Sequence, residues 1–249
     1  MNGINEFKLY WCEPIKITDK IILKTPTLSE IVDLGESNYL ELVHTFTATT
    51  MDDNIIVSLT DAGIDFNHIT NFQLFMLLIG TDIKGTDLLF DKHIDFSSFV
   101  LKGEKETPYL INKDGVIIDE TIYNLLVLYI RTMNNIPTPK VTRVKDDPMQ
   151  KQMAIDDARN QIESKKRKAM FKPQGSVLFP IMSSLVNCAE CKYDSKTIKD
   201  IGIFTFWDSV NRVLAIKNAN HIYQGLYSGC VNLKENPSLK KEMDWMRRL

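Results

Sequence analysis

The chain has 249 residues, of which 44% are hydrophobic and 25% charged, and its formal net charge is −2. This composition is typical of a globular protein rather than a disordered one, and the length allows one large core or two smaller ones. The longest apolar runs, at 74–79 and 125–130, hold about six residues, whereas a membrane-spanning helix needs roughly 20. Residues 1–7 are polar and resemble no secretory signal. We therefore expect a cytoplasmic protein that does not bind membranes.

Charge divides the chain into three parts. Residues 1–139 carry 10 Lys and Arg against 20 Asp and Glu, residues 140–172 carry 10 against 5, and residues 173–249 carry 10 against 7. We predict an acidic α+β domain at 1–139, a basic, polar helical connector at 140–172 and a helical domain at 173–249. Charge separated in this way governs association and solubility rather than reaction chemistry. The surfaces of this protein are therefore expected to bind partners.

The first 25 residues are interpreted as strands. Alternation of apolar and polar residues with a polar turn between them predicts a hairpin at 15–23. Thr27 and Glu30 have the spacing of a capping box, and apolar residues then recur on one helical face to about residue 43. A β-hairpin followed by a capped helix is therefore expected near the N-terminus.

The same order is predicted again at 109–133. Asp114-Gly115 lies between two short apolar runs, and glycine tolerates the positive φ values that tight hairpins require. Apolar residues from 122 to 133 then recur at helical spacing, and so do those at 71–79.

The connector and the C-terminal part are predicted to be helical. Asp147 as N-cap and Pro148 as first helical residue begin a polar helix that runs to about residue 170. Its apolar content is too low to stabilise it well by burial, so we expect partial order, or order gained against a partner. Ser176 and Thr205 mark the starts of two further helices, and a short terminal helix follows Pro237. The fold class is therefore α+β, with a β-hairpin/helix N-terminal part followed by a mostly α-helical C-terminal part.

Two clusters of residues have the composition of a chemical site. Cys188 and Cys191 have the C-x-x-C spacing of a zinc knuckle or redox pair, but no second pair follows and free thiols are the preferred interpretation. Asp91, His93 and Asp95 resemble a metal or acid–base group, although a solvated loop is the favoured interpretation of these three residues. We therefore predict no catalytic residue, no metal ligand and no cofactor.

A basic run consists of Lys165, Lys166, Arg167 and Lys168. Such a run can end a solvated helix, bind a protein or neutralise nucleic-acid phosphates. The solvated end is the favoured interpretation and a nucleic acid the least favoured, because the run is short and acidic residues lie nearby. The sequence also lacks the glycine-rich motifs that cradle phosphates.

Methionine-rich apolar positions are the best candidates for binding a protein, because methionine adapts to irregular surfaces. Ordinary core packing is the alternative for them. They lie in the connector and in the terminal helix, where a tryptophan joins them: Met149, Met153, Met170, Met243, Trp245 and Met246. We expect the terminal helix to contribute to binding of a partner protein or to self-association.

The order of segments resembles tail-assembly proteins of tailed bacteriophages. The resemblance rests on IKITDKIILKTPTLSEIVDLG, FQLFMLLI, YLINKDGVIIDETIYNLLVLYIRTMNN, IKDIGIFTFWDSVNRVLAIKNANHIYQGLYSG and KKEMDWMRRL. It implies a non-enzymatic chaperone in the host cytoplasm that keeps the tape-measure protein soluble, and it supplies no catalytic residues. The alternative is a structural component of the virion in the tail, baseplate or neck. A metal-dependent enzyme using Asp91, His93 and Asp95 is the third possibility.

Overall fold

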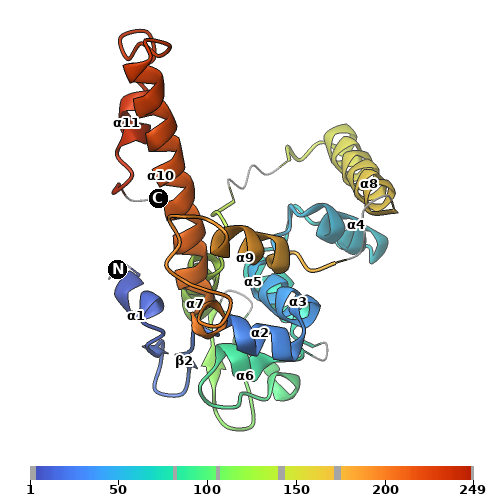
Figure 1. Cartoon of the computed structure of the whole chain (residues 1–249). Helices are drawn as coiled ribbons and strands as arrows, with labels where there is room; N and C mark the ends of the chain where they lie inside the picture. The colour runs from blue at the N-terminus through green and yellow to red at the C-terminus, as the bar shows by residue number, and fades with distance from the viewer. Residues whose placement is uncertain (1–3, 81–82, 105–106, 140–143, 171–174, 248–249) are drawn as a thin grey trace.

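The computed structural model describes residues 4–80, 83–104, 107–139, 144–170 and 175–247 (Figure 1). The elements are α1 (Glu6–Tyr10), β1 (Ile15–Lys16), β2 (Ile22–Leu23), α2 (Leu28–Leu34), α3 (Glu36–Thr47), α4 (Asp53–Asp61), α5 (Asn71–Leu78), α6 (Thr86–Leu89), η1 (Phe96–Ser98), β3 (Val100–Lys102), β4 (Tyr109–Ile111), β5 (Ile117–Ile118), α7 (Glu120–Met133), α8 (Pro148–Met170), α9 (Leu178–Val186), η2 (Ile198–Asp200), α10 (Ile203–Tyr227) and α11 (Leu239–Met243). Small antiparallel sheets in the N-terminal part and helices in the C-terminal part confirm the predicted α+β class.

Both predicted hairpins are present. Strand β1 pairs with β2, with Ile15 opposite Leu23, and β4 pairs with β5 around a turn in which Gly115 has φ +71°. Strand β3, which was not predicted, adds a third strand beside β4. Lys20 joins the two hairpins, because its Nζ donates hydrogen bonds to the carbonyl oxygens of Asp114 at 2.7 Å and Gly115 at 3.1 Å.

The interpretation of the first 25 residues as strands is wrong for 6–10, which form helix α1. The Asn5 side chain caps this helix by accepting a hydrogen bond from the backbone N–H of Lys8 at 3.2 Å. Leu9 is fully buried, and the Thr205 hydroxyl donates to the carbonyl oxygen of Tyr10 at 2.8 Å. Packing against α10 thus stabilises a helix too short to form by itself.

The helix predicted after Thr27 begins as expected and ends early. The capping box between Thr27 and Glu30 is present. The helix ends at Leu34, because Gly35 adopts φ +92°, and α3 then starts in a new direction. The predicted helix at 71–79 corresponds to α5, which has its own capping box. Helix α4 was not predicted.

The main core extends through both the N-terminal and the C-terminal parts. Phe46 lies at its centre, with ring centroids 5.3–5.8 Å from those of Phe75, Phe90 and Phe96. Buried residues of 178–213, among them the fully buried Phe206, belong to the same cluster. The core therefore crosses the predicted boundary between 1–139 and 173–249.

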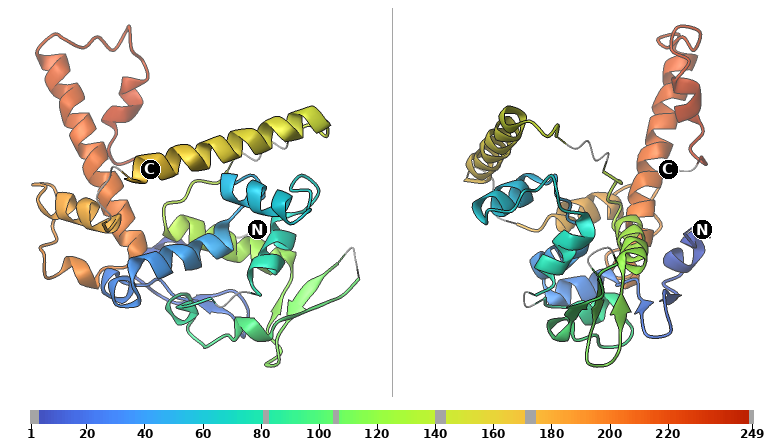
Figure 2. Two further views of the ribbon diagram at one scale, coloured as in Figure 1. Left: turned by 90° about the vertical axis from the view of Figure 1, so that its right-hand side faces the viewer. Right: turned by 180° about the vertical axis from the view of Figure 1, so that it is seen from behind.

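A second, smaller core joins helices α4 and α8, which lie side by side away from the main body (Figures 1 and 2). Ala158 of α8 is buried, and Ile155 packs against the same cluster as Ile55 and Leu59 of α4. Asp147 and Pro148 begin α8 as predicted, since an Asp147 carboxylate oxygen accepts from the N–H of Gln150 at 3.1 Å. The polar helix is thus ordered in the structure by a partner within its own chain.

Helix α10 is anchored at its first residues by the N-terminal part. Gly202, which precedes α10, forms a β-bridge with Thr27, and the N–H of Ile203 donates to the Pro26 carbonyl at 2.8 Å. A Cβ atom on Gly202 would lie 2.4 Å from Cys12 Sγ and 3.1 Å from Thr25 Cγ2. Only glycine fits this contact without displacing its neighbours.

We predict that Gly202→Ala lowers the free energy of unfolding by about 1–3 kcal/mol, the usual cost of overpacking a close contact. Gly175→Ala is the matched control, because a Cβ there meets nothing within 4 Å, and its effect is expected to stay within about 0.5 kcal/mol. Urea unfolding followed by circular dichroism measures both variants. Equal stability of the two would contradict the close packing at Gly202.

Candidate protein-interaction surfaces

A groove of about 370 Å³ lies between α9 and α10. Ile181 and Leu185 of α9 form one wall, and Val213 and Leu214 of α10 form the other. Lys217 supplies a positive charge at the α10 wall, next to Cys188. The groove therefore combines apolar walls with one cation, which suits the apolar face of a helix that also carries acidic residues.

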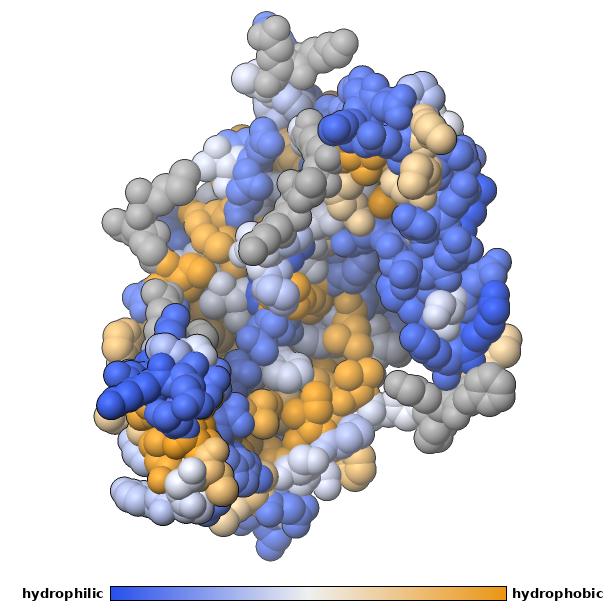
Figure 3. Space-filling model, turned by 90° about the horizontal axis from the view of Figure 1, so that it is seen from above, coloured by the Kyte–Doolittle hydropathy of each residue, from blue (hydrophilic) through white to orange (hydrophobic). Residues whose placement is uncertain are grey.

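Large hydrophobic side chains remain exposed on the two helices that form the groove: Leu214 lines it, and Val177 and Phe179 lie at the start of α9. The exposed fractions are 60% for Val177, 62% for Phe179 and 55% for Leu214. Viewed from above, hydrophobic residues gather between the polar α8 and the projecting end of α10 (Figure 3). Exposed apolar residues that adjoin an apolar groove mark a binding surface more often than scattered ones do.

The N-terminus of α9 is fixed by an acidic residue from α3. A Glu36 carboxylate oxygen accepts hydrogen bonds from the N–H groups of Val177 at 2.7 Å and Leu178 at 2.9 Å. The predicted cap, Ser176, accepts from the N–H of Phe179 at 2.8 Å. A carboxylate at this end also favours the helix dipole. The α9 wall is thus held in place without any ligand.

The predicted partner-binding residues of α8 lie apart from this groove. Met149, Met153 and Met170 are 74%, 58% and 81% exposed, and the side chains from Lys165 to Lys168 are exposed as well. Lys165 is paired with Asp53 of α4 at 2.7 Å. Part of the basic run therefore holds α8 against α4, and the exposed methionines stay available to a partner.

The terminal segment folds back along α10 (Figure 1). Met243 is half-buried there, whereas Trp245 and Met246 remain 43% and 71% exposed. Arg212 Nη1 donates to the carbonyl oxygens of Trp245 at 2.9 Å and Arg247 at 2.8 Å. Arg248, in the last turn of the terminal helix that the sequence predicts, lies outside the described residues. The predicted terminal helix ends at Met243, so the prediction that Trp245 and Met246 belong to it is wrong; they lie in the segment after α11, which packs on α10 and leaves both side chains exposed.

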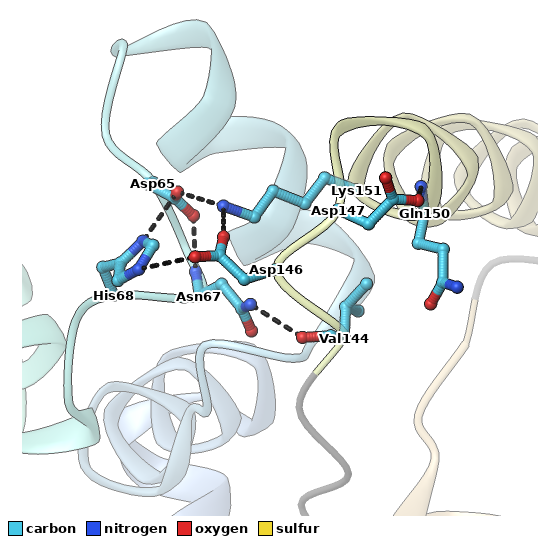
Figure 4. Close-up of polar contacts among 8 residues, drawn as sticks. All are labelled: Asp65, Asn67, His68, Val144, Asp146, Asp147, Gln150 and Lys151. Atoms are coloured by element: carbon cyan, nitrogen blue, oxygen red, sulfur yellow. Dashed lines mark hydrogen bonds and ion pairs between the residues drawn. The ribbon is translucent and has the colours of Figure 1, made fainter.

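A polar network fixes the start of α8 (Figure 4). Lys151 Nζ donates to Asp65 at 2.7 Å and also contacts Asp146, and His68 lies 2.8 Å from Asp65 and 3.5 Å from Asp146. The amide of Asn67 donates to the Val144 carbonyl at 2.7 Å. The segment that leads into α8 is therefore attached to the loop before α5.

The hydrogen bond from Lys151 is the main reason why the pKa of Asp65 is lowered to about 2. A carboxyl group whose pKa falls below its unfolded value, about 3.9, stabilises the folded state above that value. The contribution is lost as the pH falls from about 4 towards 2. Attachment of α8 should therefore weaken in acid, by a modest amount because Asp65 is partly exposed.

Asp65, His68 and Asp146 also have the composition of a metal site, since their ligand atoms lie within 4.8 Å of one another. The Lys151 ammonium already contacts both carboxylates and supplies the positive charge there. We therefore interpret the cluster as a structural network.

The two clusters that the sequence singled out as possible chemical sites differ in how closely their residues are brought together. His93 pairs with Asp87 at 2.9 Å, and Asp95 accepts from Lys113 at 2.8 Å, which holds the pKa of Asp95 far below its usual value. The structure thus gives His93 and Asp95 separate partners. Cys188 and Cys191 do lie together, in the turn after α9.

Comparison with protein-family models, curated proteins and solved structures finds no match to this chain. Within the described part of the chain, no helix is both long enough and apolar enough to span a membrane. A proposal about function therefore rests on the groove and the exposed apolar residues described above. The groove could not be predicted from the sequence, because both of its helices have ordinary amphipathic patterns.

We predict that Lys151→Met speeds hydrogen exchange in α8 by roughly two- to fivefold, because it leaves two carboxylates without their shared cation. Arg167→Gln is the control, since Arg167 pairs with Glu163 within α8 and both side chains are largely exposed. Mass spectrometry of peptides from 148–164 measures the exchange. Unchanged protection in Lys151→Met would show that apolar packing alone holds α8.

Proposed function

We propose that this protein is a non-enzymatic assembly factor of a tailed bacteriophage, which acts in the host cytoplasm and binds the tape-measure protein. The observation that carries the proposal is the preformed groove between α9 and α10 with exposed hydrophobic residues around it. The identity of the client comes from the resemblance in segment order, and the groove supplies a surface on which such a client can bind.

A helix of the client is the occupant that fits best. A tape-measure protein is long and rich in amphipathic helices, so its apolar faces need cover before assembly. The groove offers apolar walls to such a face, and Lys217 offers a charge to an acidic residue at its edge. The excess of basic over acidic residues from 140 to 249 would attract a client with acidic flanks.

The exposed methionines of α8 and the exposed Trp245 and Met246 provide further contact points. They lie on separate elements, α8 and the terminal segment, which flank the groove region (Figures 1 and 3). A long client could contact several of these points at once, and linked weak contacts raise the overall affinity.

We predict that Leu214→Glu weakens binding of the tape-measure protein by about tenfold or more, which is about 1.4 kcal/mol, because it puts a charge in the apolar wall and lets position 214 pair with Lys217, three residues along α10, in place of the client. Tyr227→Glu is the control, since Tyr227 is 88% exposed near the end of α10 and does not line the groove. Co-expression with the tape-measure protein of the same genome, followed by affinity purification, measures retention. Equal retention of the client by both variants would contradict binding in the groove.

Mass spectrometry of purified virions separates this function from that of a structural component. An assembly factor should be absent from the particles, whereas a component of the tail, baseplate or neck should be present at a fixed copy number. A fixed copy number would therefore overturn the proposed role and favour the structural one.

A further inference from the structure

The C-x-x-C segment forms a closed turn directly after α9. The N–H of Cys191 donates to the carbonyl oxygen of Cys188 at 3.1 Å, which makes the two cysteines the first and last residues of a four-residue turn. In such turns the two Cα atoms lie within 7 Å of each other, and disulfides span Cα separations of 4.4–6.8 Å. The backbone is therefore already arranged for a bond between the two sulfurs.

The environments of the two sulfurs differ. Lys217 Nζ of α10 lies 3.1 Å from Cys188 Sγ, and this contact raises the pKa of Lys217. Cys191 Sγ is directed to the carbonyl oxygen of Tyr193 at 3.6 Å. Both cysteines are free and half-buried, so a small reagent can reach them. Cys188 also lines the apolar groove, next to a fixed positive charge.

We infer that Cys188 and Cys191 are a reversible thiol–disulfide pair, oxidised by small anionic disulfides such as oxidised glutathione. Lys217 attracts the anionic reagent to Cys188. The Cys188 thiolate attacks one sulfur of oxidised glutathione, the glutathione disulfide breaks, and one glutathione thiolate leaves. The Cys191 thiolate then attacks the sulfur of Cys188 and releases the second glutathione thiolate. The two protons from the protein thiols pass to the two glutathione molecules, so the reaction converts two thiols and one disulfide into one disulfide and two thiols.

The bond would change the wall of the groove. Sγ of Cys188 would turn from Lys217 towards Cys191, and Lys217 would lose the sulfur contact. Both cysteines can be reached in the free protein, so their chemistry can be tested on the isolated chain and does not depend on the proposed function.

The test uses the purified full chain, equilibrated with mixtures of reduced and oxidised glutathione and then treated with iodoacetamide. Trypsin releases residues 169–192, which contain both cysteines, because the bond before Pro173 resists cleavage. We expect this peptide to become two hydrogens lighter and to escape alkylation. Cys230, which is exposed and has no neighbouring cysteine in sequence, should carry glutathione under the same conditions and serves as the internal control.

Three variants test the assigned roles. Cys191→Ser should accumulate glutathione on Cys188, because the second step is blocked, and Cys230→Ser should leave oxidation of the pair unchanged. Lys217→Gln should slow oxidation by glutathione severalfold. The inference is overturned if the native peptide retains glutathione, or if it stays fully alkylated when Cys230 is fully modified. Oxidation of Lys217→Gln at the native rate would remove Lys217 from the mechanism.

Discussion

The close contact between Gly202 and the 25–27 segment is the constraint on which the rest of the C-terminal part depends. It places the start of α10 against the N-terminal part, where Phe206 enters the main core. Helix α9 then packs on α10, α1 packs beside its first turns and the terminal segment lies along its outer half. One glycine without room for a side chain thus fixes the start of α10, and with it the groove and the terminal segment that pack on this helix.

The two cores are stabilised in different ways. The main core is built from aromatic and aliphatic side chains that are almost fully buried, and its stability comes from removing apolar surface from water. The contact between α4 and α8 combines a smaller apolar cluster with ion pairs, among them Arg159–Asp61 and Lys165–Asp53. Since salt screens exposed pairs but has little effect on apolar burial, raising ionic strength should loosen α8 long before it affects the main core.

Local signals in the sequence identified most elements correctly. The capping box at Thr27, the turn at Gly115 and the cap at Asp147 each depend on neighbouring residues, so the sequence alone was sufficient for them. Helix α1 was missed because its stability comes from contacts with α10, nearly 200 positions away in sequence. The groove was missed for the same reason, since amphipathic periodicity predicts an apolar face but not which part of that face stays uncovered.

Helix α10 is unevenly supported along its length. Its first turns lie in the core, while its last residues, including the exposed Tyr223 and Tyr227, project from the body (Figure 2). At 1.5 Å per residue its 25 residues extend for roughly 37 Å. Local opening of backbone hydrogen bonds should therefore be most frequent at the projecting tip and become rarer towards Ile203, so stability varies along one continuous helix. Because the groove lies on the half of α10 nearer the core, fraying of the tip leaves the groove unchanged.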